Sequence, residues 1–329
     1  MGQETGLNVP RNGTERIGFV LVPQFSMISL VSAVEPMRIA NRLKGELLYS
    51  WHLYSVDGQP VESSNGMAMM VEKPIAEVDF VPTVMVCASF EPERYETKAL
   101  LSWLRRLNRK GAEIGGLCTG AVILARAGLL NGRRATTHWE SLPGFVERFD
   151  DIEASTDLFE IDGRFLTCSG GTASLDLMLH RIGQRHGKAL SVAVSESMLH
   201  ERIRSHGDHQ RMALGLRLGI HHPKLIAIIE AMEQNLEEPL SVDELADLGS
   251  ISRRQLERLF RSHFGETPSG FYLKLRLHHA RLLLQQTGMT VLQVALACGF
   301  FSAPYFSRAY RKLFDRSPRE DRSLLRGTS

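Results

Sequence analysis

The sequence predicts a two-domain protein in which an α/β domain with a parallel sheet precedes an all-α domain with two helix-turn-helix motifs. Three observations lead to this prediction. Residues 16–200 alternate short apolar runs with stretches of helical periodicity, and the last hundred residues contain one pattern twice. The chain has 329 residues, of which 43% are hydrophobic, which is enough to build more than one core.

Short apolar runs predict the strands of the first domain, and longer amphipathic stretches predict its helices. Because strands alternate with helices, we expect a parallel sheet that is covered on both faces. Ligands of such sheets bind outside the carboxyl ends of the strands. The strands are expected at 17–22, 51–58, 84–89, 113–118 and 164–170, and the helices at 29–43, 95–110, 119–130 and from Thr172 onward.

Cys118 stands between an expected strand and the next expected helix, in the segment GGLCTGA. A strand, a Cys and an immediate helix that begins with Thr and Gly form a nucleophile-elbow arrangement, which presents the side chain above a helix N-terminus. The helix dipole at such a position favours a thiolate.

This segment resembles the DJ-1/PfpI group of the class I glutamine amidotransferase-like fold, and the downstream segment AGLLNGRRATTHW strengthens the resemblance. The resemblance covers about residues 16–195 and implies a flavodoxin-like sheet. It also implies that His138 lies near the thiol, as the matching histidine does in many members.

Catalysis by Cys118 would need a base within hydrogen-bond reach and a third group to orient that base. Proteolytic members of the family carry His directly after the Cys, where this chain has Thr119. The family's acidic residue after the first strand aligns with Ser29, and the next acid is Glu35, further along the helix. We therefore predict a ligand-binding domain without catalytic residues. The alternatives are a cysteine hydrolase or amidase tethered to DNA and a purely structural role for the Cys118 region.

The duplicated pattern spans 241–268 and 290–318, and one extra residue in the second turn shifts the offset from 49 to 50. Three pairs fit a capping box, in which each side chain satisfies an orphan amide at a helix start. We expect Gly249 and Gly299 to adopt the left-handed conformation of the tight turns. Pro268–Gln286 reads as a connecting helix with Thr267 as its cap. The three pairs are Ser241 with Glu244, Ser252 with Gln255, and Thr290 with Gln293.

Charge separates the two parts of the chain. Residues 251–329 carry 14 Lys and Arg against 5 Asp and Glu, a net +9, while the whole chain is +2, so the part before residue 251 sums to −7. A basic end on an acidic body is typical of nucleic-acid binding. On a helical wheel the arginines lie opposite an apolar stripe, Leu256, Leu259 and Phe260 in the first copy and Phe306, Ala309 and Tyr310 in the second.

From about Pro223 to Arg322 the chain is similar to the AraC/XylS family of transcription regulators, through the segments QLERLF, RLHHARLLL, VALACGF and YFSRAYRKLF. Asp315 departs from the family, which commonly has Gly there. The resemblance implies double-stranded promoter or operator DNA and RNA polymerase as partners, with no cofactor. Contacts to DNA are expected from Ser252, Arg253, Arg254, Gln255, Arg258, Arg261, Ser302, Ala303, Pro304, Tyr305, Ser307, Arg308 and Arg311.

The combination of both domains resembles the GlxA-like regulators, and most of all regulators of glycine betaine, carnitine and arginine catabolism. The resemblance implies an activator of catabolic genes whose effector is a small zwitterionic or amine metabolite. A quaternary ammonium group favours an aromatic cage, although each aromatic residue and His138 could equally be ordinary core or rim. The expected ligand-binding residues are Cys118, Thr119, His138, Trp139, Phe90 and Phe25.

The remaining features concern the boundaries and the compartment. Four cysteines without metal-like spacing indicate free thiols in a reducing compartment, and the absence of a long apolar run or secretory signal indicates the cytoplasm. The histidines of the linker are irregularly spaced, so we predict no metal there, and the linker is interpreted as a hinge or a homodimer contact. The expected divisions are 1–14 disordered tail, 15–200 sensor domain, 201–222 linker and 223–325 DNA-binding domain, with helix-turn-helix motifs at 241–262 and 290–312.

Overall fold

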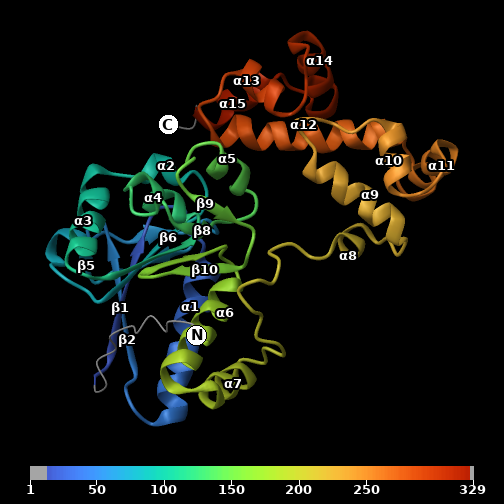
Figure 1. The fold of residues 1–329 in the computed structure, drawn as a ribbon. Coiled ribbons are helices and arrows are strands. Elements are labelled where there is room, and N and C mark those ends of the chain that lie inside the picture. The colour runs from blue at the N-terminus through green and yellow to red at the C-terminus, as the bar shows by residue number, and fades with distance from the viewer. Residues whose placement is uncertain (1–12, 327–329) are drawn as a thin grey trace. The chain divides into compact units, whose positions relative to one another are not determined.

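The computed structural model describes residues 13–326, with side chains as far as Arg322 (Figure 1). Most of the predicted disordered tail, residues 1–12, lies outside the described residues. The chain forms two compact units, called here the α/β unit (residues up to His138, and 149–210) and the helical unit (139–148, and from Arg211). The boundary after Gln210 falls inside the predicted linker, whereas the assignment of 139–148 to the helical unit has no counterpart in the sequence prediction.

The α/β unit is built on a seven-stranded sheet with the order β10-β11-β7-β6-β1-β2-β5. Every neighbouring pair is parallel except β10 and β11, which confirms the predicted mostly parallel sheet. All six residues of β6 are buried, as expected of a central strand covered on both faces. The strands are β1 (Glu15–Leu21), β2 (Tyr49–Ser55), β5 (Lys73–Pro74), β6 (Thr83–Ala88), β7 (Glu113–Cys118), β10 (Phe159–Asp162) and β11 (Phe165–Cys168).

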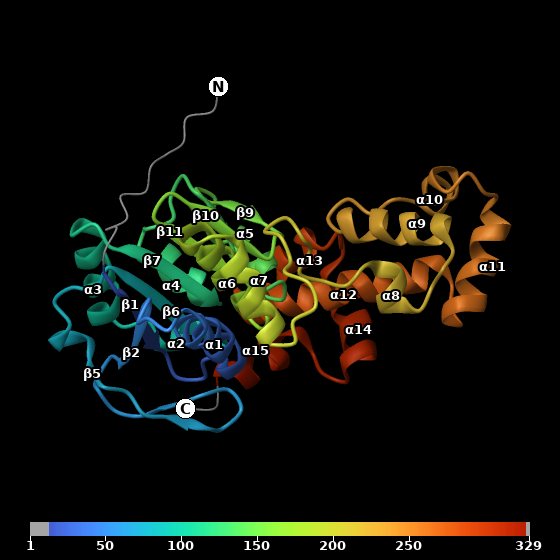
Figure 2. The same ribbon diagram turned by 90° about the horizontal axis from the view of Figure 1, so that it is seen from below.

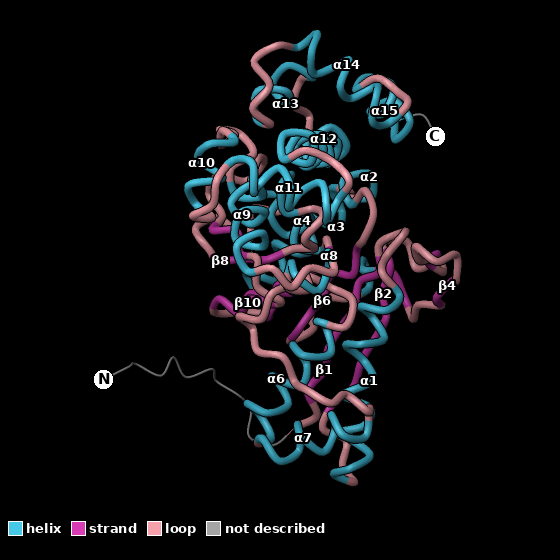
Figure 3. The backbone as a smooth tube through the Cα atoms, turned by 90° about the vertical axis from the view of Figure 1, so that its right-hand side faces the viewer, coloured by secondary structure: helices cyan, strands magenta, loops and turns pink. Residues whose placement is uncertain are grey.

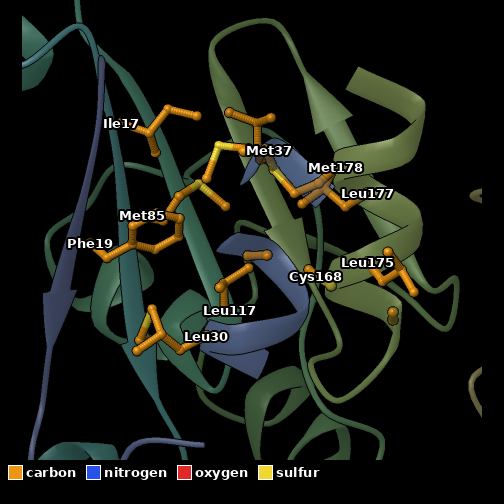
Figure 4. Packing of buried hydrophobic residues seen from close by; sticks show 14 of the residues in the cluster. Ile17, Phe19, Leu30, Met37, Met85, Leu117, Cys168, Leu175, Leu177 and Met178 are labelled. Carbon is orange, nitrogen blue, oxygen red and sulfur yellow. The ribbon is translucent and has the colours of Figure 1, made fainter. Parts of the chain in front are cut away.

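Helices cover both faces of this sheet (Figures 1 and 2). One face packs against α1 (Met27–Lys44) and α6 (Ala173–His186), and α7 (Lys188–Ser197) packs against these two helices. Figure 4 shows the contact, in which side chains of β1, β6 and β7 meet Met37 of α1 and Met178 of α6. Helices α3 (Lys98–Arg109) and α4 (Gly120–Arg126) pack on the other face.

Two helices differ in length from the sequence prediction for local reasons. The expected helix 95–110 starts only at Lys98, as α3, because the Thr97 side chain caps it by accepting from the Leu100 amide, and a separate short helix, α2 (Pro92–Tyr95), precedes it. The expected helix 119–130 ends at Arg126, and Gly128 follows with a φ of +70°. The short strands β3 (Val61–Glu62), β4 (Ala68–Met69), β8 (Arg134–Thr136) and β9 (Glu153–Ser155) were not predicted, and neither were β5 and β10 of the main sheet.

The helical unit contains two cores joined by one long helix, α12 (Pro268–Gln286). Tyr272 of α12 belongs to the first core, and Leu277, Ala280 and Leu283 belong to the second. Figure 3 shows α12 with α10 and α11 on one side and α13, α14 and α15 on the other. The other helices are α5 (Leu142–Val146), α8 (Leu214–Leu218), α9 (Pro223–Gln234), α10 (Val242–Leu248), α11 (Arg253–Phe264), α13 (Val291–Ala297), α14 (Ala303–Phe314) and α15 (Pro318–Arg326).

Candidate nucleic-acid interface and ligand site

Local caps define the start of each helix in the two helix-turn-helix motifs. All three predicted capping boxes are present, at the starts of α10, α11 and α13. Thr267 caps α12 by accepting from the Gly270 amide, and Pro268 occupies the first turn, as predicted. The bounds of α12 agree with the predicted range. The second helix of each motif, α11 or α14, carries the candidate DNA contacts, and these two helices start after the caps Ser252 and Ser302.

The two tight turns differ from the prediction in one respect. Gly299 has a φ of +71°, as expected, but Gly249 has a φ of −78° and Ser250 is the left-handed residue, with a φ of +48°. The prediction for Gly249 is therefore wrong. A Cβ at position 249 would lie 2.6 Å from Cδ1 of Ile228 in α9, so a larger residue there would require the Ile228 side chain to shift.

Helices α11 and α14 each bury an apolar face and expose a polar one. Leu256 and Phe260 are fully buried in the first core, and Phe306 and Tyr310 in the second. The predicted arginines lie on the outer faces. Exposed residues of the predicted interface are Ser252, Arg253, Arg254, Gln255, Arg258, Arg261, Ser302, Pro304, Tyr305, Arg308 and Arg311, while Ala303 and Ser307 are partly buried.

The exposed arginines are not equivalent electrostatically. The Arg253 guanidinium lies 3.3 Å from a carboxylate oxygen of Glu257 and 3.7 Å from one of Asp243. Within the described part of the chain, Arg254 and Arg308 have no such acidic partner within 4.0 Å. Their guanidinium groups are therefore available to bind the base edges or phosphates of DNA.

A basic hollow of about 420 Å³ follows the outer face of α14 and includes residues that the prediction missed. Lys312 lies four residues after Arg308, and side chains at this spacing share a helix face. That spacing was the available sequence signal for Lys312, whereas Ser317 approaches only through the fold. Such a hollow suits a phosphate of the DNA backbone. It is lined by Ser307, Arg308, Arg311, Lys312 and Ser317.

Asp315 follows α14 in the left-handed conformation, with a φ of +56°, and its amide donates to the carbonyl oxygen of Arg311. Its counterpart after α11, Gly265, has a φ of +71°. We expect Asp315→Gly to raise the free energy of unfolding by up to about 1 kcal/mol, since glycine adopts this conformation without steric cost. Thermal unfolding measures the effect. A variant with a lower melting temperature would show that the Asp315 side chain itself stabilises this turn.

The predicted nucleophile elbow is present in the α/β unit. Cys118 ends β7 with a φ of +58°, which is unusual for a residue with a Cβ and characteristic of this turn. Its side chain is 6% exposed, and its sulfur lies 4.0 Å from the Ser89 hydroxyl oxygen. The Thr119 hydroxyl donates to the Ser89 carbonyl oxygen at a distance of 2.5 Å. The carboxyl ends of β6 and β7 thus bring Ser89, Cys118 and Thr119 together.

Ser29, the predicted counterpart of the family's acid, places a hydroxyl group beside the elbow. A Cβ on Gly170 would lie 2.6 Å from the Cβ of Cys118 and 3.0 Å from the Ser29 hydroxyl oxygen, so both side chains flank this glycine. The Ser29 oxygen accepts from the Gly171 amide at 2.7 Å. Glu35 instead forms a 2.6 Å ion pair with Arg38 on α1.

The aromatic candidates occupy three different environments. Phe25 is fully buried in the core, and only its backbone pairs with Ser89. Phe90 is 63% exposed. Trp139 belongs to the helical unit, where the Arg211 guanidinium carbon lies 4.6 Å from the centroid of its ring. His138, the preceding residue, belongs to the α/β unit and is partly buried. Ser89 and Ser29 were missed as site residues, and the signal for Ser89 was its place after the strand beside β7.

Two further observations concern the four cysteines and the apolar character of the helices. All four cysteines are free and buried, as predicted. Burial raises the pKa of the Cys87 thiol above its usual range and raises the pKa of Cys168 to about 12. Among the described residues, no helix combines the length and apolar character needed to cross a membrane.

Comparison with known proteins identifies the family. Residues 245–323 match the family described as "Helix-turn-helix domain", and residues 16–184 match the DJ-1/PfpI family. The chain is 51% identical to the HTH-type transcriptional regulator CdhR of Pseudomonas aeruginosa over 93% of this chain and 91% of that protein. This chain belongs to the AraC-type transcriptional regulators that carry a DJ-1/PfpI domain. The relatives are transcriptional regulators, and the helix-turn-helix domain of this chain implies DNA binding.

Two further similarities agree with this assignment. The regulator is 47% identical to the HTH-type transcriptional regulator GbdR of Pseudomonas aeruginosa, over 95% of this chain and 86% of that protein. A crystal structure of an AraC family transcriptional regulator from Pseudomonas putida has a TM-score of 0.51 at 26% identity, and the match covers 56% of this chain and 99% of that chain.

Proposed function

We propose that the regulator is a ligand-responsive activator of catabolic genes, whose effector is a small zwitterionic amine or amino acid of the betaine class. The observation that carries the proposal is the Cys118 elbow, which keeps its strained backbone but has the Ser29 hydroxyl where the family has an acid. A retained site without the acid favours binding over turnover. The resemblance to regulators of betaine, carnitine and arginine use supports the class of effector.

The chemistry around the elbow suits such a ligand. The hydroxyls of Ser89 and Thr119 lie beside Cys118 at the carboxyl edge of the sheet, where ligands of parallel sheets bind. His138 would donate to a carboxylate, and the exposed ring of Phe90 would face a quaternary ammonium group. Phe25 would shape the site from within the core, because its ring is fully buried.

On the DNA side, α11 and α14 are proposed to enter successive major grooves about 34 Å apart. Arg254, Gln255 and Arg258 would read bases in the first groove, since guanidinium groups match guanine and carboxamides match adenine. Activation would require contact with RNA polymerase. A homodimer stays a prediction of the sequence.

A chain of hydrogen bonds within the α/β unit supports coupling between the ligand site and the end of the unit. The Thr137 hydroxyl donates to the Cys118 carbonyl oxygen at 3.1 Å. The side-chain amide of Gln210, the last residue of the unit, donates to the Thr137 carbonyl oxygen at 3.0 Å and to the Thr136 hydroxyl at 2.9 Å. An effector that binds one arrangement of these groups more tightly than another would favour that arrangement. It would thereby change the position of Gln210, where the chain leaves the α/β unit.

The test of the effector is a thermal-shift screen of the full chain against glycine betaine, carnitine and free amino acids. A compound bound only by the folded protein raises the melting temperature, by an amount that grows with the ratio of ligand concentration to Kd. We expect a shift from a betaine-class compound and none from its uncharged analogues. The effector proposal would be abandoned if no compound changed either the melting temperature or DNA binding, which would leave a constitutive DNA binder.

Cys118→Ser separates the sensor from the alternative, a cysteine hydrolase tethered to DNA. We expect the variant to keep full DNA affinity and to change only the response to the effector, because Ser preserves the shape of the elbow. A hydrolase would lose all turnover in the same variant. DNA-binding titrations and amide-hydrolysis assays on wild type and variant measure both properties. Hydrolysis by the wild type that disappears in Cys118→Ser would establish the enzyme instead.

A further inference from the structure

The extra residue of the second helix-turn-helix turn can be identified from the backbone as Phe301. The left-handed residues Ser250 and Gly299 correspond at an offset of 49, whereas the caps Ser252 and Ser302 correspond at 50. Between the left-handed residue and the cap, the first motif has Ile251 alone and the second has two phenylalanines. The residue before Ser302 is therefore the insertion.

The two phenylalanines have opposite environments. Phe300 is 2% exposed, and its ring centroid lies 5.0 Å from that of Phe306 in the second core, so it takes the place of the partly buried Ile251. Phe301 is 90% exposed. Its side chain therefore contributes little to the folding of the unit, and its presence needs another explanation.

Phe301 lies directly beside the end of α14 that would enter the groove. The first turn of α14 presents Pro304 and Tyr305, which are exposed and apolar over most of their surface, the latter at 48%. The corresponding turn of α11 carries Arg253 and Arg254. Base edges in the major groove include one apolar group, the 5-methyl group of thymine, which is matched by apolar side chains.

We propose that Phe301 is a specificity-determining residue that packs against thymine 5-methyl groups in the groove entered by α14. This inference rests on the proposed placement of α14 in a major groove. The occupant is DNA, since helix-turn-helix proteins contact base edges with the N-terminal residues of the second helix, and Phe301 extends that surface by one aromatic ring. The insertion thus adds an apolar side chain to the base-contacting surface of the second motif, whereas the same surface of the first motif carries guanidinium groups.

The experiment removes the methyl group and the ring separately. Binding sites are first selected from random-sequence duplexes by the full-length wild type. In the selected half-site that depends on α14, each thymine is then replaced by uracil, which differs from thymine only in lacking the 5-methyl group. We expect wild type to bind the deoxyuracil duplex about fourfold more weakly for each methyl group that Phe301 no longer meets, and Phe301→Ala to bind both duplexes equally. Phe301→Leu, which keeps an apolar side chain, should retain part of the discrimination.

Leu216→Ala is the matched control, because Leu216 is also an exposed apolar residue, at 67%, but lies on α8. It should discriminate between the duplexes as wild type does. The proposal is overturned if Phe301→Ala keeps the wild-type ratio of affinities for the two duplexes, as it would if it weakened binding to both by the same factor, or if the half-site contains no thymine. A wild type that selects no sequence at all would instead refute the proposed function, and unchanged melting temperatures of the variants establish that they fold.

Discussion

Arg254→Ala is expected to relax base preference at one position of the binding site, whereas Arg308→Ala is expected to weaken binding to all sequences alike. Arg254 is exposed on the first turn of α11 and has no acidic partner within the described residues. A bidentate contact from such a guanidinium to guanine is worth about 1–3 kcal/mol of discrimination. Arg308 instead lines the basic hollow with Arg311 and Lys312, which suits a phosphate.

Selection from randomised duplexes and titrations at several salt concentrations separate these effects. Removing a side chain that binds a phosphate should reduce the slope of log affinity against log salt by about one, with little change of sequence preference. Lys98→Ala, which removes an exposed positive charge from the α/β unit, controls for net charge. Equal loss of sequence preference in Arg254→Ala and Arg308→Ala would refute the asymmetry between the two motifs.

The parts of the fold that were predictable from sequence depend on interactions between residues close in the chain. A capping box joins a residue to the third one after it, so Ser252 with Gln255 and Thr290 with Gln293 could be recognised in the sequence and are present in the structure. The elbow at Cys118 was recognisable for the same reason, because strand, turn and helix follow one another directly. Periodicity similarly indicated which faces of α11 and α14 are buried.

Features that depend on distant contacts were not predictable. Residues 139–148 join the helical unit because they meet the end of α12, where Gly144 leaves no room for a Cβ beside the Gln286 side chain. The Gln286 side-chain amide donates to the Glu140 carbonyl oxygen at 2.6 Å, and Arg148 donates to the Gln286 carbonyl oxygen at 3.2 Å. Nothing in the local sequence indicates partners more than 130 residues away.

The ligand-site candidates show the same limit. Phe25 and Phe90 both follow strands and look alike in sequence, yet one ring is fully buried and the other mostly exposed. The exposure of an aromatic ring is set by what packs over it, and this depends on the whole fold. The same holds for Gly249, which lies close to the Ile228 side chain of α9 while Ser250 takes the left-handed conformation.

Arg181→Met is expected to lower the free energy of unfolding of the α/β unit at neutral pH by about 3–5 kcal/mol, the range typical of breaking a buried ion pair from one side. Arg181 is 5% exposed and its guanidinium donates to the carboxylates of Glu15 and Glu113. The Arg185 guanidinium also contacts both carboxylates, at 2.7 Å from Glu15 and 3.3 Å from Glu113. Arg185 is less buried than Arg181, so it would compensate only part of the lost charge pairing.

The pH dependence of this effect follows from Glu113. Burial alone would raise the pKa of its carboxyl, but the charge of Arg181, its hydrogen bond and the charge of Arg185 outweigh burial and hold the pKa below its usual value of 4.5. The stability gained from this carboxylate is present above pH 4.5 and is lost as pH falls through the lower folded pKa. Without Arg181 the pKa of Glu113 should rise, so protonation would relieve the buried charge at a higher pH.

Urea unfolding at pH 7 and pH 4.5, followed by tryptophan fluorescence, tests both expectations, since Trp51 and Trp103 lie in the α/β unit. The difference in the free energy of unfolding between Arg181→Met and wild type should be smaller at pH 4.5 than at pH 7. Arg126→Met, which breaks the partly exposed ion pair with Glu96, should cost no more than about 1 kcal/mol. The double variant Arg181→Met, Glu113→Gln should regain part of the stability at pH 7, because it removes one of the two carboxylates that lose Arg181, while Glu15 keeps Arg185. A double variant as unstable as the single one would mean that Arg181 stabilises the sheet through its packing and not through its charge.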